Sequence, residues 1–428
     1  MTDLLIINPN SSTNYKGMDT LKAIETPIWA AMIAHEYRKQ GGVVHIMDAN
    51  AMGFSHKMVA RLVEQIRPLG IMVVVFGHNP TASTQLMPSV AALCKEIKHV
   101  SSAFVSIFGT HSSALPERTE KETDIDEVVR GVVNKNLDKE LSGVAWDLLP
   151  MDKYRAHNWH CFGRDRQPYA SLYTSLGCPY SCDFCPIHAP LKKKRFSKWS
   201  PEWVIWQIEL LVEKYGVKNI KISDELFLSD RKRVLQICNL IIKKEYDLNI
   251  WAYGRVDYCP PSVLERMKKA GFNWIGLGIE SRKGKGGDPH KAIQKYKDAG
   301  ININANYMFG LPGDDLNSMK DTLGLAIELN TEFANFHSCM AYPGSKLYDQ
   351  AKKKDLPDSW EGYGQYNYEC KPLPTKHLTS AEILRFRDQA FKTYFTNPEY
   401  LKMMENKFGK EVRAEIEGMK MEFERRIL

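Results

Sequence analysis

Short apolar runs alternate with helix-length segments over the first 150 residues. The runs are Leu4–Ile7, Val43–Met47, Ile71–Phe76 and Ala103–Phe108. Between the first two, the segment Pro27–Lys39 carries Ile28, Ala31 and Met32 at helical spacing and ends just before a pair of glycines. This alternation predicts an α/β domain, in which a parallel sheet has helices on both faces in a doubly wound, flavodoxin-like order.

A second alternation begins at Tyr169. Its strand-like runs are Tyr169–Thr174, Asn219–Ser223, Ile250–Arg255, Trp274–Ile279, Asn304–Phe309 and Ala334–Cys339. Helical segments such as Glu202–Tyr215 separate them, which favours a partial (β/α)6 barrel whose chemistry gathers at the carboxyl ends of the strands. After about residue 346 the sequence becomes charged and helical, and Thr379 and Glu382 form a capping-box-like start to a helix that runs towards Tyr394.

We therefore predict a doubly wound domain at 1–145, a linker at 146–168, a barrel at 169–345 and a mostly helical region at 346–428. With 428 residues, 43% of them hydrophobic and 25% charged, the chain can bury several cores. No apolar run approaches the roughly 18 residues of a membrane span, and the start lacks a signal peptide's basic region. Nine cysteines, an odd number, indicate a reducing compartment, so we expect a cytoplasmic protein.

Cys178, Cys182 and Cys185 carry the strongest chemical signal in the chain. They lie in a loop rich in glycine and proline, where their thiolates can converge on one iron–sulfur cluster and leave one iron without a protein ligand. The alternatives are a zinc site or three unrelated thiols. Zinc normally takes four ligands, usually as two paired motifs, and the chain has no second Cys-x-x-Cys.

This spacing resembles that of the radical S-adenosylmethionine (radical SAM) superfamily, in which the open iron of a [4Fe–4S] cluster binds SAM. The resemblance implies that the three cysteines hold the cluster and that Phe184 lies near the adenine of SAM. Polar residues at the predicted strand ends extend the match. By resemblance, the SAM amino group would be contacted by Ser223, Asp224 and Glu225, its carboxylate by Arg255, and its ribose by Glu280 and Ser281.

The loops at the carboxyl ends of the first sheet resemble the cobalamin-binding domain that precedes many radical SAM cores. The run Asp48-x-Asn50-x-x-Gly53 falls where that domain has Asp-x-His-x-x-Gly, and a carboxamide is a poor axial ligand, so cobalamin would bind without a histidine from this motif. The resemblance implies cobalamin contacts at Asn8, Asn10, Asp48, Asn50, Gly53, Gly77, Asn79, Ser83, Gly109, Thr110, Ser112 and Ala114. The alternative is a degenerate flavodoxin-like domain that holds nothing, or holds part of the substrate. His78 and His111 lie in these loops and are interpreted as hydrogen-bonding groups.

Together the resemblances imply an enzyme that uses a [4Fe–4S] cluster, SAM and cobalamin to methylate an unactivated carbon of a small molecule, through methylcobalamin and a 5′-deoxyadenosyl radical. One alternative is rearrangement or cyclisation without methyl transfer, and another is a non-catalytic cobalamin or iron–sulfur carrier or sensor. A methylthiotransferase acting on transfer RNA is disfavoured, because the N-terminal half has only Cys94 and Cys161 and lacks ligands for a second cluster. Nothing in the sequence selects the substrate.

Charge and aromatic clusters add little to the choice of partner. The net charge of +7 is spread along the chain, with its densest cluster at Lys192–Arg195. That cluster is either a solvated loop or an attractor for an anionic substrate or an acidic electron donor, and we expect a flavodoxin- or ferredoxin-like donor and no nucleic acid. An aromatic-rich loop at Trp360–Tyr368 either lies over the barrel mouth or is a packed cluster, and Cys339 and Cys370 are interpreted as incidental cysteines.

Overall fold

The structure is a computed structural model and describes residues 2–11, 22–77, 79, 81–131, 143–191, 194–258, 260–284, 286–419 and 421–428. His78 and two lysines of the basic cluster, Lys192 and Lys193, lie outside the described residues.

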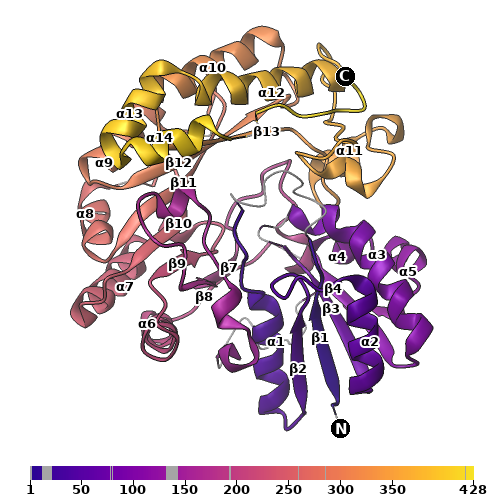
Figure 1. Cartoon of the computed structure of the whole chain (residues 1–428). Coiled ribbons are helices and arrows are strands. Elements are labelled where there is room, and N and C mark those ends of the chain that lie inside the picture. The colour runs from indigo at the N-terminus through magenta and orange to yellow at the C-terminus, as the bar shows by residue number, and fades with distance from the viewer. Residues whose placement is uncertain are drawn as a thin grey trace.

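The N-terminal domain contains a five-stranded parallel sheet in the order β2-β1-β3-β4-β5. Its strands are β1 (Leu4–Asn8), β2 (Val44–Asp48), β3 (Gly70–Val75), β4 (Phe104–Gly109) and β5 (Glu127–Val128). The helices are α1 (Ile28–Lys39), α2 (His56–Ile66), α3 (Ala82–Val100), α4 (Thr110–Ala114) and α5 (Pro116–Thr123). The domain is drawn in indigo and purple in Figure 1.

Alternate residues of these strands enter two different cores. In β1, Ile6 belongs to the core that contains α1, whereas Leu5 and Ile7 belong to the core that contains α2 and α3. A strand buried on both faces needs apolar residues in both registers, which explains the continuous apolar runs of the sequence. The doubly wound, flavodoxin-like fold is confirmed.

The second sheet has six parallel strands in the order β13-β12-β11-β10-β9-β6. They are β6 (Tyr169–Leu172), β9 (Asn219–Ile222), β10 (Asn249–Arg255), β11 (Phe272–Glu280), β12 (Asn302–Phe309) and β13 (Phe333–Ser338). The intervening helices are α6 (Pro201–Glu209), α7 (Arg231–Lys244), α8 (Pro261–Lys269), α9 (Pro289–Asp298) and α10 (Leu316–Leu329). Each of these six strands pairs with the next of the six along the chain, so the sheet is the predicted partial barrel, with open edges at β6 and β13.

Aromatic residues of the linker close the barrel at the amino ends of its strands. Trp159 is 5% exposed, and its ring centroid lies 5.0 Å from that of Trp251, 5.3 Å from that of Trp274 and 5.9 Å from that of Phe333. The rings come from three barrel strands and from the linker, so the linker forms the floor of the barrel. Any ligand must therefore enter from the carboxyl ends or from the open edge.

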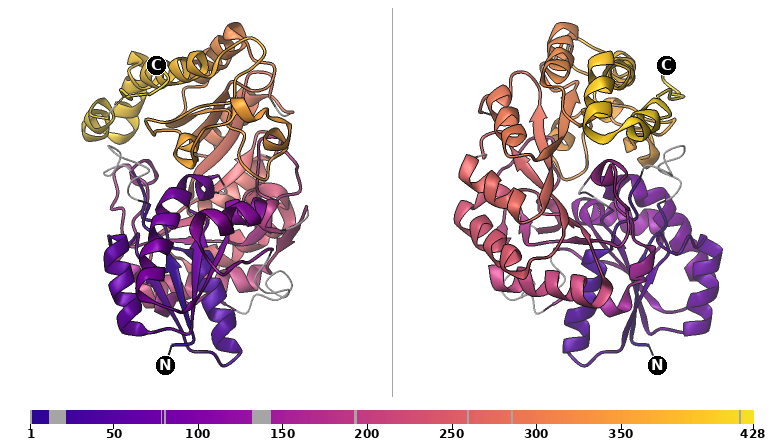
Figure 2. Two further views of the ribbon diagram at one scale, coloured as in Figure 1. Left: turned by 90° about the vertical axis from the view of Figure 1, so that its right-hand side faces the viewer. Right: turned by 60° about the vertical axis from the view of Figure 1, so that its left-hand side comes forward.

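The last part of the chain is mostly helical, with α11 (Lys346–Gln350), α12 (Ser380–Phe395), α13 (Pro398–Phe408) and α14 (Lys410–Glu417). In Figures 1 and 2 the helices α12–α14 (yellow) lie beside β13 and α10. The capping box at Thr379 is present, because Thr379 Oγ1 accepts from the Glu382 amide and Glu382 Oε2 accepts from the Thr379 amide. Among the described residues, no helix combines the length and the apolar character needed to cross a bilayer.

The aromatic-rich loop of this region packs on the N-terminal domain. Trp360 and Tyr363 are buried, Trp360 Nε1 donates to Glu122 Oε2, and the Arg118 guanidinium lies 4.0 Å from the Trp360 ring centroid. The packed-cluster interpretation therefore describes Trp360 and Tyr363, whereas Tyr368 is 55% exposed. This loop ties the C-terminal region to α5.

Candidate active site

The three cysteines lie in a non-helical loop at the carboxyl end of β6. A short antiparallel pair, β7 (Ser175–Gly177) and β8 (Phe196–Lys198), closes the base of this loop. Gly177 has a φ of +80°, and a Cβ at this position would lie 2.1 Å from the Arg195 carbonyl oxygen. Only glycine fits where the backbone of β7 approaches that of the segment before β8 so closely. The sequence therefore turns sharply just before Cys178.

The neighbourhood of each thiol is partly apolar. Burial raises the pKa of Cys178, and it raises the pKa of Cys185 to about 12, while the other cysteines of the loop act in the same direction. Phe184 packs against an apolar cluster at the ends of β12 and β13 that contains Met308 and Cys339. This is the edge of the barrel at which the sequence predicts SAM.

Asp224 anchors the start of the cysteine loop. Its carboxylate accepts hydrogen bonds at 2.6 Å from the Thr174 amide, from Thr174 Oγ1 and from Ser175 Oγ. Burial raises its pKa in spite of these donors and of the nearby Arg233. These bonds make Asp224 a structural tie between β9 and the loop, and its predicted SAM contact remains a prediction.

The other residues predicted to contact SAM lie at the carboxyl ends of neighbouring strands. Arg255 forms two 3.0 Å hydrogen bonds to Asp257, and its guanidinium stacks 4.0 Å from the ring centroid of Tyr180 in the cysteine loop. Glu225 Oε2 is buried without a hydrogen-bond partner, and burial and the charge of Asp224 raise its pKa to about 8. The arrangement brings Arg255, Asp224 and Glu225 to the cysteine loop.

Glu280 ends β11 in a left-handed backbone conformation, with a φ of +68°. A non-glycine residue there is strained by about 1–3 kcal/mol, and such strain persists where the surrounding structure holds it. Ser281 follows, with its amide bonded to the Ile279 carbonyl. The two residues share the strand-end edge with the cysteine loop, and their contact with the ribose stays a prediction.

In the N-terminal domain, Asp48 organises the loops at the ends of β1 and β2. It is 2% exposed and accepts hydrogen bonds from Asn8 Nδ2 at 2.8 Å and from Tyr154 Oη at 2.9 Å. Burial raises its pKa. Its carboxylate thus links β1, β2 and the linker.

The remaining residues of the predicted motif form a separate network. Asn50 Oδ1 accepts from the amide and the hydroxyl of Ser11, and Asn10 Nδ2 donates to the Phe54 carbonyl. Gly53 has a φ of +65° and open space around it. Asp48, Asn50 and Gly53 line neither of the two cavities described below, and their cobalamin contacts remain predictions.

The loops after β3 and β4 interlock. Gly77 has a φ of +66°, and Asn79 Oδ1 accepts from the Ala82 amide at the start of α3. Ser83 Oγ accepts from the His111 amide at 3.0 Å, while Ser112 Oγ donates to the Gly109 carbonyl. Gly109 lies against Val75, where a Cβ would meet the Val75 carbonyl oxygen at 2.2 Å.

Three buried side-chain polar atoms in α4 lack hydrogen-bond partners, Thr110 Oγ1, His111 Nε2 and Ser113 Oγ. Thr110 lines a cavity, whereas His111 packs edge-on against Trp360 with their ring centroids 4.4 Å apart. Ala114 lies at the domain interface, since a Cβ on Gly344 would meet the Ala114 Cβ at 3.1 Å. The helix α4, which carries Thr110, therefore lies beside the carboxyl end of the barrel.

Two cavities lie between the N-terminal domain and the barrel, with about 410 and 350 Å³ of empty space. Both are lined by Trp29, Phe76, Gly77 and Tyr173. The first also contains the predicted cobalamin residue Asn8 and the predicted SAM residue Ser223. The second also contains Asn79, Thr110, Gly177 and Glu225. Each cavity thus connects a predicted cobalamin loop with a predicted SAM strand.

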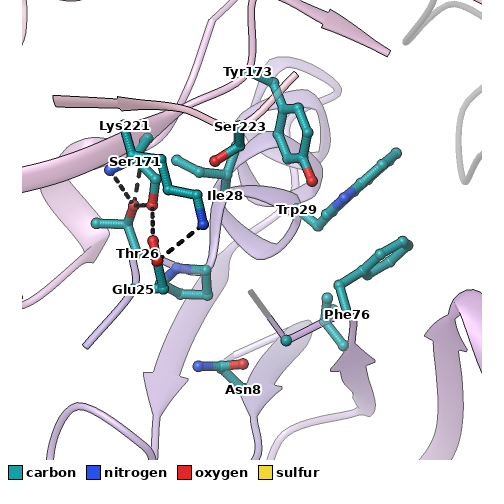
Figure 3. A pocket seen from close by; sticks show the side chains of 13 residues that line it. Asn8, Glu25, Thr26, Ile28, Trp29, Phe76, Ser171, Tyr173, Lys221 and Ser223 are labelled. Atoms are coloured by element: carbon teal, nitrogen blue, oxygen red, sulfur yellow. Dashed lines mark hydrogen bonds and ion pairs between the residues drawn. The ribbon is translucent and has the colours of Figure 1, made fainter. Parts of the chain in front are cut away.

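Figure 3 shows how the first cavity is divided between two kinds of side chain. Trp29, Phe76 and Tyr173 form an aromatic wall, in which Trp29 stacks on Phe76 with the ring centroids 4.5 Å apart. The opposite side is polar and contains Glu25 and Lys221.

The sequence singled out Asn8 and Ser223 of this cavity but not its aromatic wall, nor Glu25 and Lys221. Strand alternation could have indicated Tyr169, Ser171 and Tyr173 as one face of β6, and Lys221 and Ser223 as one face at β9. No local pattern distinguishes Glu25 or Trp29 from ordinary residues before and within a helix.

Residues 172–326 match the family model described as the Radical SAM superfamily. The match covers the cysteine loop and most of the barrel strands. The chain contains a radical SAM domain. It is also similar to an uncharacterized methyltransferase of Pyrococcus horikoshii, with 27% identity over 94% of each chain. The predicted family membership is confirmed.

Two solved structures share the fold of both sheets. The radical SAM methyltransferase TsrM of Kitasatospora setae, solved with cobalamin and a [4Fe–4S] cluster, aligns with a TM-score of 0.62 and 15% identity over 81% of this chain and 74% of its own. The cobalamin-dependent SAM radical enzyme OxsB, solved with aqua-cobalamin and SAM, aligns with a TM-score of 0.67 and 13% identity over 97% of this chain and 71% of its own.

The chemistry of the donor groups fits the implied cofactors. Among the residues that the structure describes, no three Cys, His, Asp or Glu side chains gather tightly enough to hold a single metal ion. A [4Fe–4S] cluster does not require this, because each cysteine binds a different iron. The unpartnered Glu225 Oε2 suits a cationic amino group, and Thr110 Oγ1 and the side-chain-free Gly77 suit a bulky polar ligand.

Proposed function

We propose that this protein is a cobalamin-dependent radical SAM enzyme that methylates an unactivated carbon of a small molecule. One observation carries the proposal. Four residues predicted for cobalamin and two predicted for SAM come from different domains, yet they line the same two cavities: Asn8, Gly77, Asn79 and Thr110, with Ser223 and Glu225. A substrate carbon placed there would face both cofactors.

In this proposal, Cys178, Cys182 and Cys185 hold a [4Fe–4S] cluster. Ser223, Glu225, Arg255 and Glu280 surround SAM, and Asn8, Gly77, Asn79 and Thr110 contact cobalamin. When bound, the cluster with SAM would supply hydrogen-atom abstraction and cobalamin would supply the methyl group.

The chain's own groups orient the reactants and exclude water. The aromatic wall of Trp29, Phe76 and Tyr173 gives an apolar surface beside the reacting centre, which protects reactive species from solvent. Glu225 presents a carboxyl to the cationic end of SAM.

Two further inferences concern the surroundings of the enzyme. Cluster chemistry needs an external electron, so we infer a flavodoxin- or ferredoxin-like donor. The cysteines within the described part of the chain are all free thiols, which supports a reducing compartment, the cytoplasm.

Anaerobically reconstituted protein tests the proposal with SAM and titanium(III) citrate as the probes. We expect 5′-deoxyadenosine from the wild type and from Cys94→Ala, which alters a buried cysteine of the N-terminal domain, and none from Cys182→Ala. The wild type should also retain added hydroxocobalamin through gel filtration. If Cys182→Ala forms 5′-deoxyadenosine at the wild-type rate, the cluster assignment is wrong.

A further inference from the structure

A carboxylate of the N-terminal domain is inserted into the open side of the barrel. Glu25, which precedes α1, accepts hydrogen bonds from Tyr169 Oη at 2.6 Å and from Ser171 Oγ at 2.9 Å. Its other oxygen is paired with Lys221 Nζ at 2.9 Å. The donors belong to β6 and β9, the first two strands of the barrel. Figure 3 shows Glu25 beside Ser171 and Lys221.

Thr26, the residue next to Glu25, is hydrogen-bonded to the edge strand β6. Thr26 Oγ1 accepts from the Ser171 amide at 2.9 Å, and the two hydroxyl oxygens lie 2.7 Å apart. Ile24 forms an isolated antiparallel bridge with Arg155 of the linker. The segment 24–26 therefore acts as a short cover over the exposed edge of β6, whose backbone donors would otherwise need water.

The Glu25–Lys221 pair is almost completely shielded from water. The Lys221 side chain is 2% exposed and that of Glu25 is 14% exposed. The Lys221 ammonium also lies 5.1 Å from the ring centroid of Trp251. A buried pair of this kind is a weak source of net stability, but removal of one partner leaves an uncompensated charge and is strongly unfavourable.

The pair is not arranged as a substrate ligand. Both oxygens of Glu25 are engaged by barrel side chains, so a substrate would have to displace an existing bond to reach them. Lys221 and Ser223 lie two residues apart and so face the same side of the sheet. Glu25, Lys221 and Ser223 line one cavity with Asn8 and Gly77. The pair therefore lies where the barrel meets the cobalamin-side loops.

We propose that the Glu25–Lys221 pair is a positioning pair, which fixes the gap between the cobalamin-side loops and the SAM-side strands. This inference rests on the proposed function for its effect on the reactions of SAM. The Glu25–Lys221 ion pair itself is present in the chain without cofactors. In this role the pair acts through the arrangement of the two domains and not by contact with the reacting atoms.

A displaced pair should affect two reactions of SAM differently. Reductive cleavage to 5′-deoxyadenosine uses groups of the barrel, with one electron from titanium(III) and a hydrogen atom from the medium or buffer. Methylation of reduced cobalamin breaks the sulfur–methyl bond, leaves S-adenosylhomocysteine, and uses the electron pair of cobalt(I) for the new bond. The second reaction crosses the domain interface, and the first does not.

The variants are Glu25→Gln, Lys221→Met and the double variant, which removes both charges of the pair together. Arg38→Met is the matched control, because Arg38 joins α1 to Asp147 of the linker through an exposed ion pair of 2.7 Å. Hydrogen exchange of the cofactor-free proteins is measured at segments 22–27 and 169–173. We expect at least tenfold faster exchange in the single variants and no change in Arg38→Met.

The same proteins are then loaded with cluster, hydroxocobalamin and SAM under titanium(III) citrate. In Lys221→Met and the double variant, the ratio of S-adenosylhomocysteine to 5′-deoxyadenosine should fall at least tenfold, with 5′-deoxyadenosine within threefold of wild type. Lys221→Arg should restore the ratio to within threefold. A general loss of folded enzyme would lower both products together.

The inference is overturned if exchange is unchanged in the single variants, or if the double variant keeps the wild-type product ratio. Failure of the proposed function looks different. In that case the wild type itself gives no 5′-deoxyadenosine and retains no cobalamin, while the exchange measurement still decides whether the pair holds the two domains together.

Discussion

His111 makes the N-terminal domain sensitive to acid. Its side chain is 0% exposed, and burial, assisted by the positive charge of Arg118, lowers its pKa to about 3. In the unfolded chain the imidazole has a pKa of about 6.5. The folded state therefore binds fewer protons than the unfolded state between these two values, and stability falls as the pH falls through about 6.5.

The size of the effect follows from the two pKa values. At pH 5.0 the unfolded chain gains about 2 kcal/mol by protonating this imidazole, while the folded chain gains almost nothing. Any folded-state pKa below about 4 gives the same figure, so the result depends only on the burial of the ring. At pH 7.5 the contribution is about 0.1 kcal/mol or less.

The assay is urea unfolding of the cofactor-free protein at pH 7.5 and pH 5.0. His111→Asn stays neutral at both values, so the wild type should lose about 2 kcal/mol more than the variant on acidification. The loss of the contact between His111 and Trp360 does not depend on pH, so it cancels when the two pH values are compared. The buried His160 is present in both proteins, so its contribution cancels as well. His99→Gln, an exposed histidine in α3, is the control. An equal loss in wild type and His111→Asn would refute the reasoning.

Other variants test the barrel and the cysteine loop. Trp159→Ala should destabilise the protein by about 3–5 kcal/mol in urea unfolding, because it removes the centre of the barrel floor, whereas Trp206→Ala, at a residue 42% exposed, should change stability by less than about 0.5 kcal/mol. Gly177→Ala should lower the iron bound per chain at least fivefold, since a Cβ would strike a backbone oxygen across the loop, while Gly313→Ala, which meets nothing within 4 Å, should not. Phe184→Ala should weaken SAM binding at least tenfold in a titration and keep its iron, and loss of iron in parallel would contradict its placement beside the adenine.

Most of the fold could be predicted from hydrophobic periodicity. The strands of both sheets are buried on both faces or face a packed lumen, so their apolar runs are continuous and their bounds agree with the structure to within a few residues. The run predicted as Tyr169–Thr174 extends two residues past the end of β6 at Leu172. Thr174 is instead bonded to Asp224, and this contact across strands has no signal in the local sequence.

The candidate site was predictable where it depends on motifs and unpredictable where it depends on contacts between domains. The cysteine loop and the strand-end residues stand out because their spacing is unusual for a structural loop. Trp29 does not stand out, because a tryptophan within an apolar helix reads as a core residue, and in the structure it is also 6% exposed. Its role at a shared wall arises only when the second sheet is placed beside the first.

Glu25 illustrates why contacts of this kind escape sequence reasoning and why they are informative in a structure. An isolated glutamate before a helix is most simply explained as a solvated or capping residue. Here it enters a barrel that begins more than 140 residues later, and its partners at Tyr169, Ser171 and Lys221 all face the lumen side of their strands. A charge is moved so far from water only where several donors receive it, so the placement requires that the two domains meet in one defined arrangement. Chemistry shared between two cofactors held by different domains needs that same condition.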